Sequence, residues 1–299
     1  AGGTDNVAIG NHSGTAITTG DKNTAVGSLS LEANTTASYN TAVGFSSLKT
    51  NITGAGNTGL GYRSLELTTG DNNTALGYEA GAANAGGASN TAVGKSALCK
   101  NTTGSNNVAV GNATLFANTT ADNNIAIGKQ ALTSNTTGTR NVAVGCGALL
   151  SNVNDNDNTG IGFATLVNSS GQSNTAVGSS ALNSNTTASN NTAVGYYSLE
   201  ANTTGTQNTT TGTNSMLCNI DGNDNTAMGV SALRCNTTGD RNTAIGLQSS
   251  YKTTADDNTA LGACALFQNT TASDNTAIGA LALACNTTGA ENTALGLQA

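Results

Sequence analysis

The hydrophobic and polar positions of this chain repeat with one period from end to end. A phrase of the type Asn-Thr-Ala-Val-Gly occurs eighteen times, almost always 17 residues apart, from Asn6 to Asn292. With its Asn counted as position 0, the phrase has Thr, Val or Ile at position 1. It usually has Ala at position 2, an aliphatic residue at position 3 and always Gly at position 4. Branched residues that alternate with small ones are typical of a short β-strand. The Gly indicates a backbone corner, with either a positive φ or no room for a Cβ atom.

The rest of each repeat predicts more short segments and turns. Position 7 is small and position 8 is usually Leu, which predicts a second short strand. An Asn-Thr-Thr-Gly phrase and two polar residues then lead back to the next Asn, as turn-forming residues do. Three intervals have 16 residues, ending at Asn73, Asn174 and Asn258. We expect the missing residue to lie between the Leu position and the Thr-Thr pair.

A period of 17 residues that covers the whole chain predicts stacked copies of one small unit. We therefore expect an all-β fold, a parallel β-solenoid of about 17 coils with 17 residues per coil. Residues 1–299 would form a single uninterrupted domain. Two or three short strands per coil would place like residues in ladders: Asn at position 0, aliphatic residues at position 3, Leu at position 8 and Thr at position 13.

Composition limits the kinds of partner that the chain can bind, but it does not decide how the core is filled. Charged residues make up 9% of the chain, the net charge is −7, and the 10 Lys and Arg are scattered singly, which argues against a nucleic-acid surface. No apolar run reaches the length of a membrane span. Each coil has only about two large apolar side chains. The coil must therefore be thin, or its aliphatic face must be shared with a neighbouring chain.

No pattern in the chain predicts a catalytic, cofactor-binding or metal-binding site, and we expect no enzyme. His12 is the only histidine, so neither a His-based triad nor a multi-histidine metal site can be built. The string from Gly54 to Gly59 matches G-x-G-x-x-G, but its glycines are ordinary repeat positions. The segment 155–160 approaches a calcium loop, yet Leu166 stands where the bidentate Glu belongs.

Two groups of side chains are candidates for contacts. Five aromatic residues follow the Gly corner and could form lateral contacts or a sugar-binding stripe, or shield the strand edge: Phe45, Tyr62, Tyr78, Phe163 and Tyr196. Cys218 and Cys235 are 17 residues apart and would stack on neighbouring coils, within the range that a disulfide needs. The alternative is that these cysteines are small, buried apolar residues.

The phrases Asn107-Val-Ala-Val-Gly111 and Asn6-Val-Ala-Ile-Gly10 resemble head repeats of YadA-like trimeric autotransporter adhesins, which form left-handed parallel β-rolls. The longer unit, with its Ala-Leu and Asn-Thr-Thr-Gly phrases, resembles repeats of bacterial and phage tail-fibre proteins. The autotransporter head period is shorter than 17. The resemblance implies a trimer, in which position 2 points into each narrow roll and position 3 faces the partner chains. In a single-chain solenoid, positions 3 and 8 would fill the core instead.

These features indicate an extracellular structural fibre subunit, of a cell surface or a phage appendage, that self-associates. Copies would stack head to tail through their terminal coils, with the lateral assembly as a trimer that the resemblance implies. The residues expected at the axial contact are Ala1, Asp5, Asn6, Gly10, Asn292, Gly296 and Ala299. The alternative is a surface or tail-fibre adhesin that binds glycans or a host surface, and an ice-binding solenoid is a further one.

Overall fold

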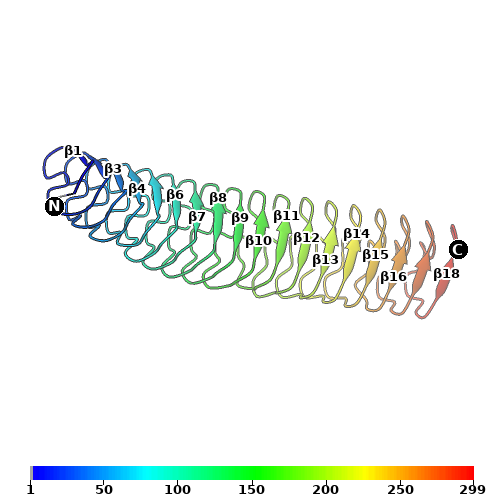
Figure 1. The fold of residues 1–299 in the computed structure, drawn as a ribbon. Helices are drawn as coiled ribbons and strands as arrows, with labels where there is room; N and C mark the ends of the chain where they lie inside the picture. The colour runs from blue at the N-terminus through cyan, green and yellow to red at the C-terminus, as the bar shows by residue number, and fades with distance from the viewer. Residues whose placement is uncertain (1–2) are drawn as a thin grey trace. The chain divides into compact units, whose positions relative to one another are not determined.

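The computed structural model describes residues 3–299, which divide into two compact units, Ala1–Asn156 and Asp157–Ala299. Unit 1 contains nine strands (Figure 1): β1 Val7–Ile9, β2 Thr24–Val26, β3 Thr41–Val43, β4 Thr58–Leu60, β5 Thr74–Leu76, β6 Thr91–Val93, β7 Val108–Val110, β8 Ile125–Ile127 and β9 Val142–Val144. Unit 2 contains nine more: β10 Thr159–Ile161, β11 Thr175–Val177, β12 Thr192–Val194, β13 Thr209–Thr211, β14 Thr226–Met228, β15 Thr243–Ile245, β16 Thr259–Leu261, β17 Thr276–Ile278 and β18 Thr293–Leu295. Coils are numbered below by the strand they contain.

Each unit is a parallel β-solenoid, which confirms the predicted fold class. Within a unit every strand pairs in parallel with the next, and like positions face each other, as Ala42 faces Gly59 and Ala176 faces Ala193. No helix forms within residues 3–299. Whether 1–299 acts as a single domain, and the handedness of the coil, stay predictions.

The expectation of a second and third strand in each coil is wrong. Each coil has one three-residue strand, and positions 5 to 10 form a turn. The reason lies in the backbone: positions 6 and 8 adopt left-handed conformations, as at Ser46 (φ 55°) and Leu48 (φ 51°). A bulky residue rarely adopts this region, and it is incompatible with a strand. The left-handed conformations at positions 6 and 8 turn the backbone so that the side chains of positions 7 and 8 both point to the inside of the coil.

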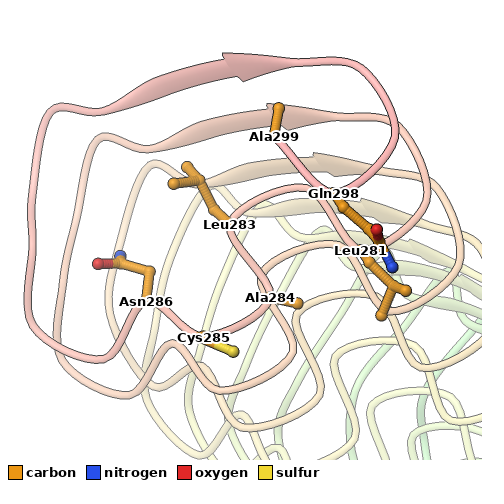
Figure 2. A pocket seen from close by; sticks show the side chains of 7 residues that line it. All are labelled: Leu281, Leu283, Ala284, Cys285, Asn286, Gln298 and Ala299. Atoms are coloured by element: carbon orange, nitrogen blue, oxygen red, sulfur yellow. The ribbon is translucent and has the colours of Figure 1, made fainter.

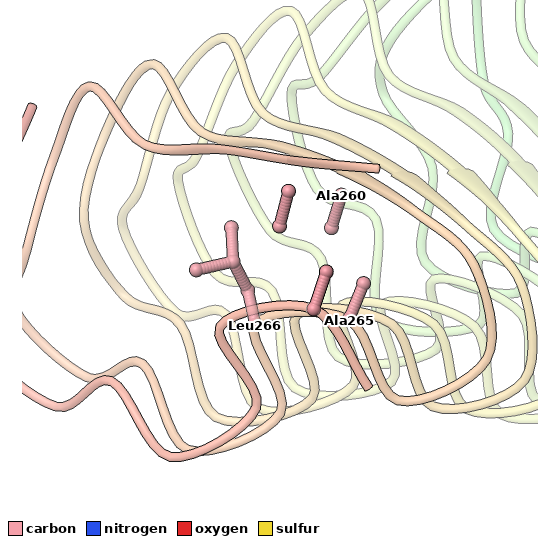
Figure 3. Close-up of a cluster of buried hydrophobic side chains, with 5 residues drawn as sticks. Ala260, Ala265 and Leu266 are labelled. Carbon is pink, nitrogen blue, oxygen red and sulfur yellow. The ribbon is translucent and has the colours of Figure 1, made fainter. Parts of the chain in front are cut away.

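The core of each coil is thin and consists of three positions. In coil 7, Ala109 at position 2, Thr114 at position 7 and Leu115 at position 8 are all fully buried. Figure 3 shows the equivalent arrangement in unit 2, where Ala265 and Leu266 point from the turn segment toward Ala260 on the strand. Position 3 lies outside, as the resemblance to β-roll repeats implies, whereas position 8 fills the core.

Two buried ladders of asparagine hold the coils together. At position 0, the Asn107 side chain donates to Ala121 O (2.8 Å) and accepts from the backbone N–H of Asn124, one coil further on (3.0 Å). At position 11, Asn118 donates to Asn101 Oδ1 (2.7 Å) and also to Ala121 O (3.1 Å). Both ladders therefore converge on the carbonyl of position 14. The ladder at position 0 was predicted and the one at position 11 was not.

The deletions fall in a different part of the turn from the predicted one. In 17-residue coils the position 11 Asn reaches a partner three residues on, as Asn185 reaches Ala188 O (2.9 Å). In the 16-residue coil 10, Ser169 takes its buried place and contacts Gly171, only two residues on, through Gly171 N (3.4 Å). Thr68 and Thr253 are the buried equivalents in the other two short coils. The missing residue thus lies after position 11, and the shorter side chain matches the shorter turn.

The invariant Gly at position 4 has both a positive φ and no room for a Cβ atom, which the sequence had suggested as alternatives. Gly111 has φ 138°, and a Cβ atom there would lie 2.6 Å from the carbonyl oxygen of Gly128 in the next coil. The corner backbones of successive coils therefore pack directly on one another, which excludes every side chain at this position.

Candidate functional site

The outer face of the strands is an uncharged surface formed by positions 1 and 3, which we call the outer sheet face. Position 1 is Thr, Val or Ile throughout, and position 3 is aliphatic in every coil except coil 13, where it is Thr211. Several position 3 side chains are well exposed, among them Leu76 (49%) and Ile127 (40%). A contiguous exposed apolar surface of this kind marks an interaction site more often than a chance feature of a monomer.

Three of the five predicted aromatic residues form one stack beside this face. Phe45 and Tyr62 lie 5.5 Å apart and Tyr62 and Tyr78 lie 5.1 Å apart, with ring planes within about 12° of parallel. The Lys95 ammonium lies 5.9 Å from the Tyr78 ring, and the negative charge of Glu79 raises the pKa of Tyr78. Tyr62 is the middle ring of the stack, so both of its faces are covered by the neighbouring rings.

The other two predicted aromatic residues lie in unit 2 and are not stacked on each other. Phe163 is 62% exposed, and Tyr196 contacts its neighbour Tyr197 edge to face at 4.1 Å. Ser179 occupies the coil between them. Their ring faces are therefore less covered than those of the stack in unit 1.

A shallow groove runs beside positions 6, 9 and 10 in both units, with different chemistry in each. In unit 1 it holds about 230 Å³ and is charged, since Arg63 pairs with Glu66 (2.6 Å) and Glu79 (3.5 Å). In unit 2 it holds about 320 Å³ and is largely apolar, lined by Phe267, Leu281 and two cysteines. The stretch in unit 1 also contains Cys99 and Lys100, and burial raises the pKa of the Cys99 thiol.

The polar turn at positions 15 and 16 forms a further ladder that the sequence analysis missed. At position 15, the side chain of one coil accepts the backbone N–H of the preceding coil, as Asp122 does from Ser105 (2.6 Å) and Ser189 does from Gln172 (3.1 Å). The same contact from Thr4 lowers the pKa of Asp21. The alternation of Asp, Ser and Asn at this position was the available signal, but it was read only as turn chemistry.

The Thr ladder also lies one position earlier than predicted. The Thr102 hydroxyl at position 12 donates to Thr119 O (2.8 Å), and that of Thr186 donates to Thr203 O (2.9 Å). Asn34, the first residue of an Asn-Thr-Thr string, is fully buried and bonded to Ala37. The folded chain therefore does not present that side chain for glycosylation.

The residues predicted at the axial contact lie in different units, apart from Ala1, which is outside the described residues. Asn6 accepts from Asn23 N (2.9 Å), and Asn292 donates to Asn275 Oδ1 through both its N–H and its amide (3.0 and 3.1 Å). Asp5 has φ 60°, as position 16 does in other coils. Gly10 and Gly296 are position 4 glycines of coils 1 and 18.

A cavity of about 520 Å³ lies at coils 17 and 18 (Figure 2). Its lining includes the core residue Leu283, Cys285 of the groove and Ala299, whose carbonyl accepts from Leu283 N (2.9 Å). The lining is mainly apolar and combines the edge of the core with the end of the groove.

Cys218 and Cys235 are both half-buried free thiols in the structure, at position 10 of coils 13 and 14. Among residues 3–299, no group of three or more His, Cys, Asp and Glu side chains is arranged to hold a metal ion. The same residues include no helix that is long and apolar enough to cross a membrane.

Comparison of the chain with protein-family models finds no match, and a search of curated proteins finds none either. The functional argument therefore depends on the geometry above.

Proposed function

We propose that the chain is a segment of an extracellular structural fibre, in which copies associate laterally through the outer sheet face. The observation that carries the proposal is the exposure of the aliphatic side chains at position 3. Burial of such side chains between chains would remove them from water, at about 25 cal/mol for each Å² of apolar surface. A trimer is the assembly that the resemblance to β-roll adhesins and tail fibres favours.

Axial stacking is the second part of the proposal. Within each unit every coil contacts the next through the same groups, namely the strand backbone and the side chains at positions 0, 11 and 15. The same contacts between two copies would continue the solenoid, because an open sheet edge is a template for pairing. Electron micrographs showing only isolated short rods of the pure chain would contradict this part alone.

Lateral association is tested by the mass of the native assembly. We expect analytical ultracentrifugation to give masses in steps of about 88 kDa, three times the 29.3 kDa of one chain, because axial stacking adds whole trimers. Ile127→Asp places a charge on the outer sheet face and should change the mass step from that of a trimer to that of a single chain. Thr120→Asp, at an exposed turn position of the same unit, is the matched control and should leave the assembly unchanged.

A wild-type chain that stays at 29.3 kDa across the concentrations tested would overturn the lateral part of the proposal. An assembly that survives Ile127→Asp would instead show that the contact uses another surface.

Adhesion to neutral glycans is the second candidate, favoured by the exposure of Phe163 and Tyr196. Sugars bind aromatic side chains through the ring face, and both faces of Tyr62 are covered by its neighbours in the unit 1 stack. A glycan array should therefore lose its signal with Phe163→Ala and keep it with Tyr62→Ala. Equal loss with both variants, or no binding by the wild type, would rule out this site.

A further inference from the structure

Cys218 and Cys235 occupy the same position in two successive coils of unit 2. The backbone continues its coil-to-coil bonding through both residues, since Cys218 N donates to Arg234 O and Cys235 N donates to Tyr251 O, each at 3.0 Å. Coils that bond backbone to backbone in this way have the spacing of neighbouring parallel strands, about 4.8 Å, inside the Cα range of about 4.4–6.8 Å that disulfides show. The coil geometry therefore places the two residues at bridging distance.

None of the other four cysteines is placed in this way. Cys99 is at position 9, Cys146 at position 5 and Cys264 at position 6. Cys285 is also at position 10, but it lies three coils beyond Cys235. Only one of the possible pairings within the chain joins like positions of adjacent coils.

The two thiols are accessible to solvent, and their surroundings have opposing effects on the pKa of Cys218. Both thiols are half-buried. Burial raises the pKa of Cys218, the neighbouring Cys235 raises it further, and the guanidinium of Arg234 opposes both effects. Arg234 is itself held beside the pair by a hydrogen bond to the Tyr251 hydroxyl (2.9 Å).

We propose that Cys218 and Cys235 form a reversible disulfide that joins coils 13 and 14 when a small-molecule disulfide is present as oxidant. One cysteine, as the thiolate, attacks oxidised glutathione and releases the first glutathione thiolate. The second cysteine then attacks the mixed disulfide at the first cysteine's sulfur, forming the protein disulfide and releasing the second glutathione thiolate. The two cysteines are oxidised, one glutathione disulfide is reduced to two thiols, and these take up the protons that the cysteines lose.

The bond should be reducible rather than permanent. Disulfides need Cβ atoms about 3.5–4.5 Å apart, slightly closer than the coil spacing of about 4.8 Å. The two coils must therefore approach each other slightly, and strained or exposed disulfides are the labile ones.

The proposed disulfide would hold coil 13, whose core residues differ from those of the other coils. Coil 13 has Thr210 where other coils have Ala or Gly, and its hydroxyl bonds to Ser198 Oγ (2.6 Å). The same coil has Met216 in place of the usual Leu. A disulfide across coils 13 and 14 would join this atypical coil covalently to a coil with the usual core residues.

The test is oxidation of the reduced full-length chain with oxidised glutathione, followed by thiol titration, intact mass measurement and peptide mapping. We expect the number of free thiols to fall from six to four. The mass should fall by two hydrogens, and one cross-linked peptide pair should contain Cys218 and Cys235. The urea midpoint of the oxidised chain should rise and return after treatment with dithiothreitol.

Cys218→Ser should keep all its remaining thiols free of intramolecular bonds and lose the shift in midpoint, whereas Cys99→Ser should retain both the bridge and the shift. The inference would be overturned if the wild type gained only glutathione adducts, or if the mapped disulfide joined other residues or two chains. None of these results depends on the proposed fibre role.

Discussion

The inner asparagine ladders and the outer sheet face reverse the usual distribution of polarity. Asn107 and Asn118 are fully buried, while Ile127 and Leu76 are substantially exposed. The amides of Asn107 and Asn118 are each bonded both within their own coil and to a neighbouring coil, so hydrogen bonds offset the cost of their burial. The aliphatic residues have no equivalent constraint and lie on the side of the strand that the thin core does not use.

The comparison teaches that size and hydrogen bonding, more than polarity, decide what enters this core. In most coils the interior between the strand and the opposite turn admits Ala, a small residue and one Leu. The corner positions require a side chain that satisfies backbone carbonyls and N–H groups, and Asn does this in both directions along the stack.

Replacing a ladder amide should have the largest effect. Asn107→Leu leaves the buried N–H of Asn124 without its acceptor and should destabilise the chain by about 3 kcal/mol. Urea unfolding followed by circular dichroism measures the change. Ile127→Thr on the outer face is the control and should cost less than about 0.5 kcal/mol in the monomer. Equal costs for the two variants would contradict the comparison.

The orientation of the strand could not be predicted from its alternation. Positions 1 and 3 form one face and position 2 the other, and either face has the right period for a core. The sequence analysis left both alternatives open for position 3. The structure places Ala inside because the facing segment contributes Leu to the same space, a contact that joins residues far apart within each coil.

Other features lacked a local signal for physical reasons. Leu at position 8 was read as a strand residue because bulky side chains rarely adopt positive φ, yet Leu48 does. Asn at position 11 was read as a turn former, and its second use in cross-coil bonding depends on the stacking itself. The strand phrase, the Gly corner, the Leu ladder and the coil length were predictable because each is repeated without a change of context.

A substitution in the core of coil 15 tests whether size and hydrogen bonding decide what the inner side of the coil accepts. Ser250 occupies the Leu position, is fully buried, and its hydroxyl has no hydrogen-bond partner among the described residues. Ser250→Leu should fill the gap between Leu233 and Leu266 and raise stability by about 1–2 kcal/mol.

Gly81→Leu is the matched control, because Leu65 already occupies the space there: a Cβ atom at Gly81 would lie 2.9 Å from Leu65 Cδ2. That variant should lose about 1–3 kcal/mol through overpacking. Urea midpoints that move in the same direction for both variants would show that coil 15 has no vacancy.

A mismatch between the side chain at position 11 and the length of the turn should have a smaller effect on stability. Ser169→Asn puts the longer amide into a 16-residue coil and should cost about 1 kcal/mol, since the amide overreaches Gly171. Insertion of one Thr between Ser170 and Gly171 in the same variant should restore the loss. If the insertion destabilised the chain further, the turn rather than the side chain would determine the coil length.

The smallest expected effect concerns the exposed charges at the polar turn. Arg241 forms two hydrogen bonds of 2.7 Å to Asp257 and lowers the pKa of that carboxyl. Because the folded pKa lies below the unfolded value of about 3.9, the stabilisation is complete above that value and is lost as the pH falls through the folded pKa. Exposed pairs contribute little, so Asp257→Asn should lower the urea midpoint at pH 7 only slightly, and the difference should shrink as the pH falls through the folded pKa. Asp274→Asn, at the same position one coil later, is the control. A midpoint difference for Asp257→Asn that stays constant as the pH is lowered would show that the Arg241 contact is not its cause.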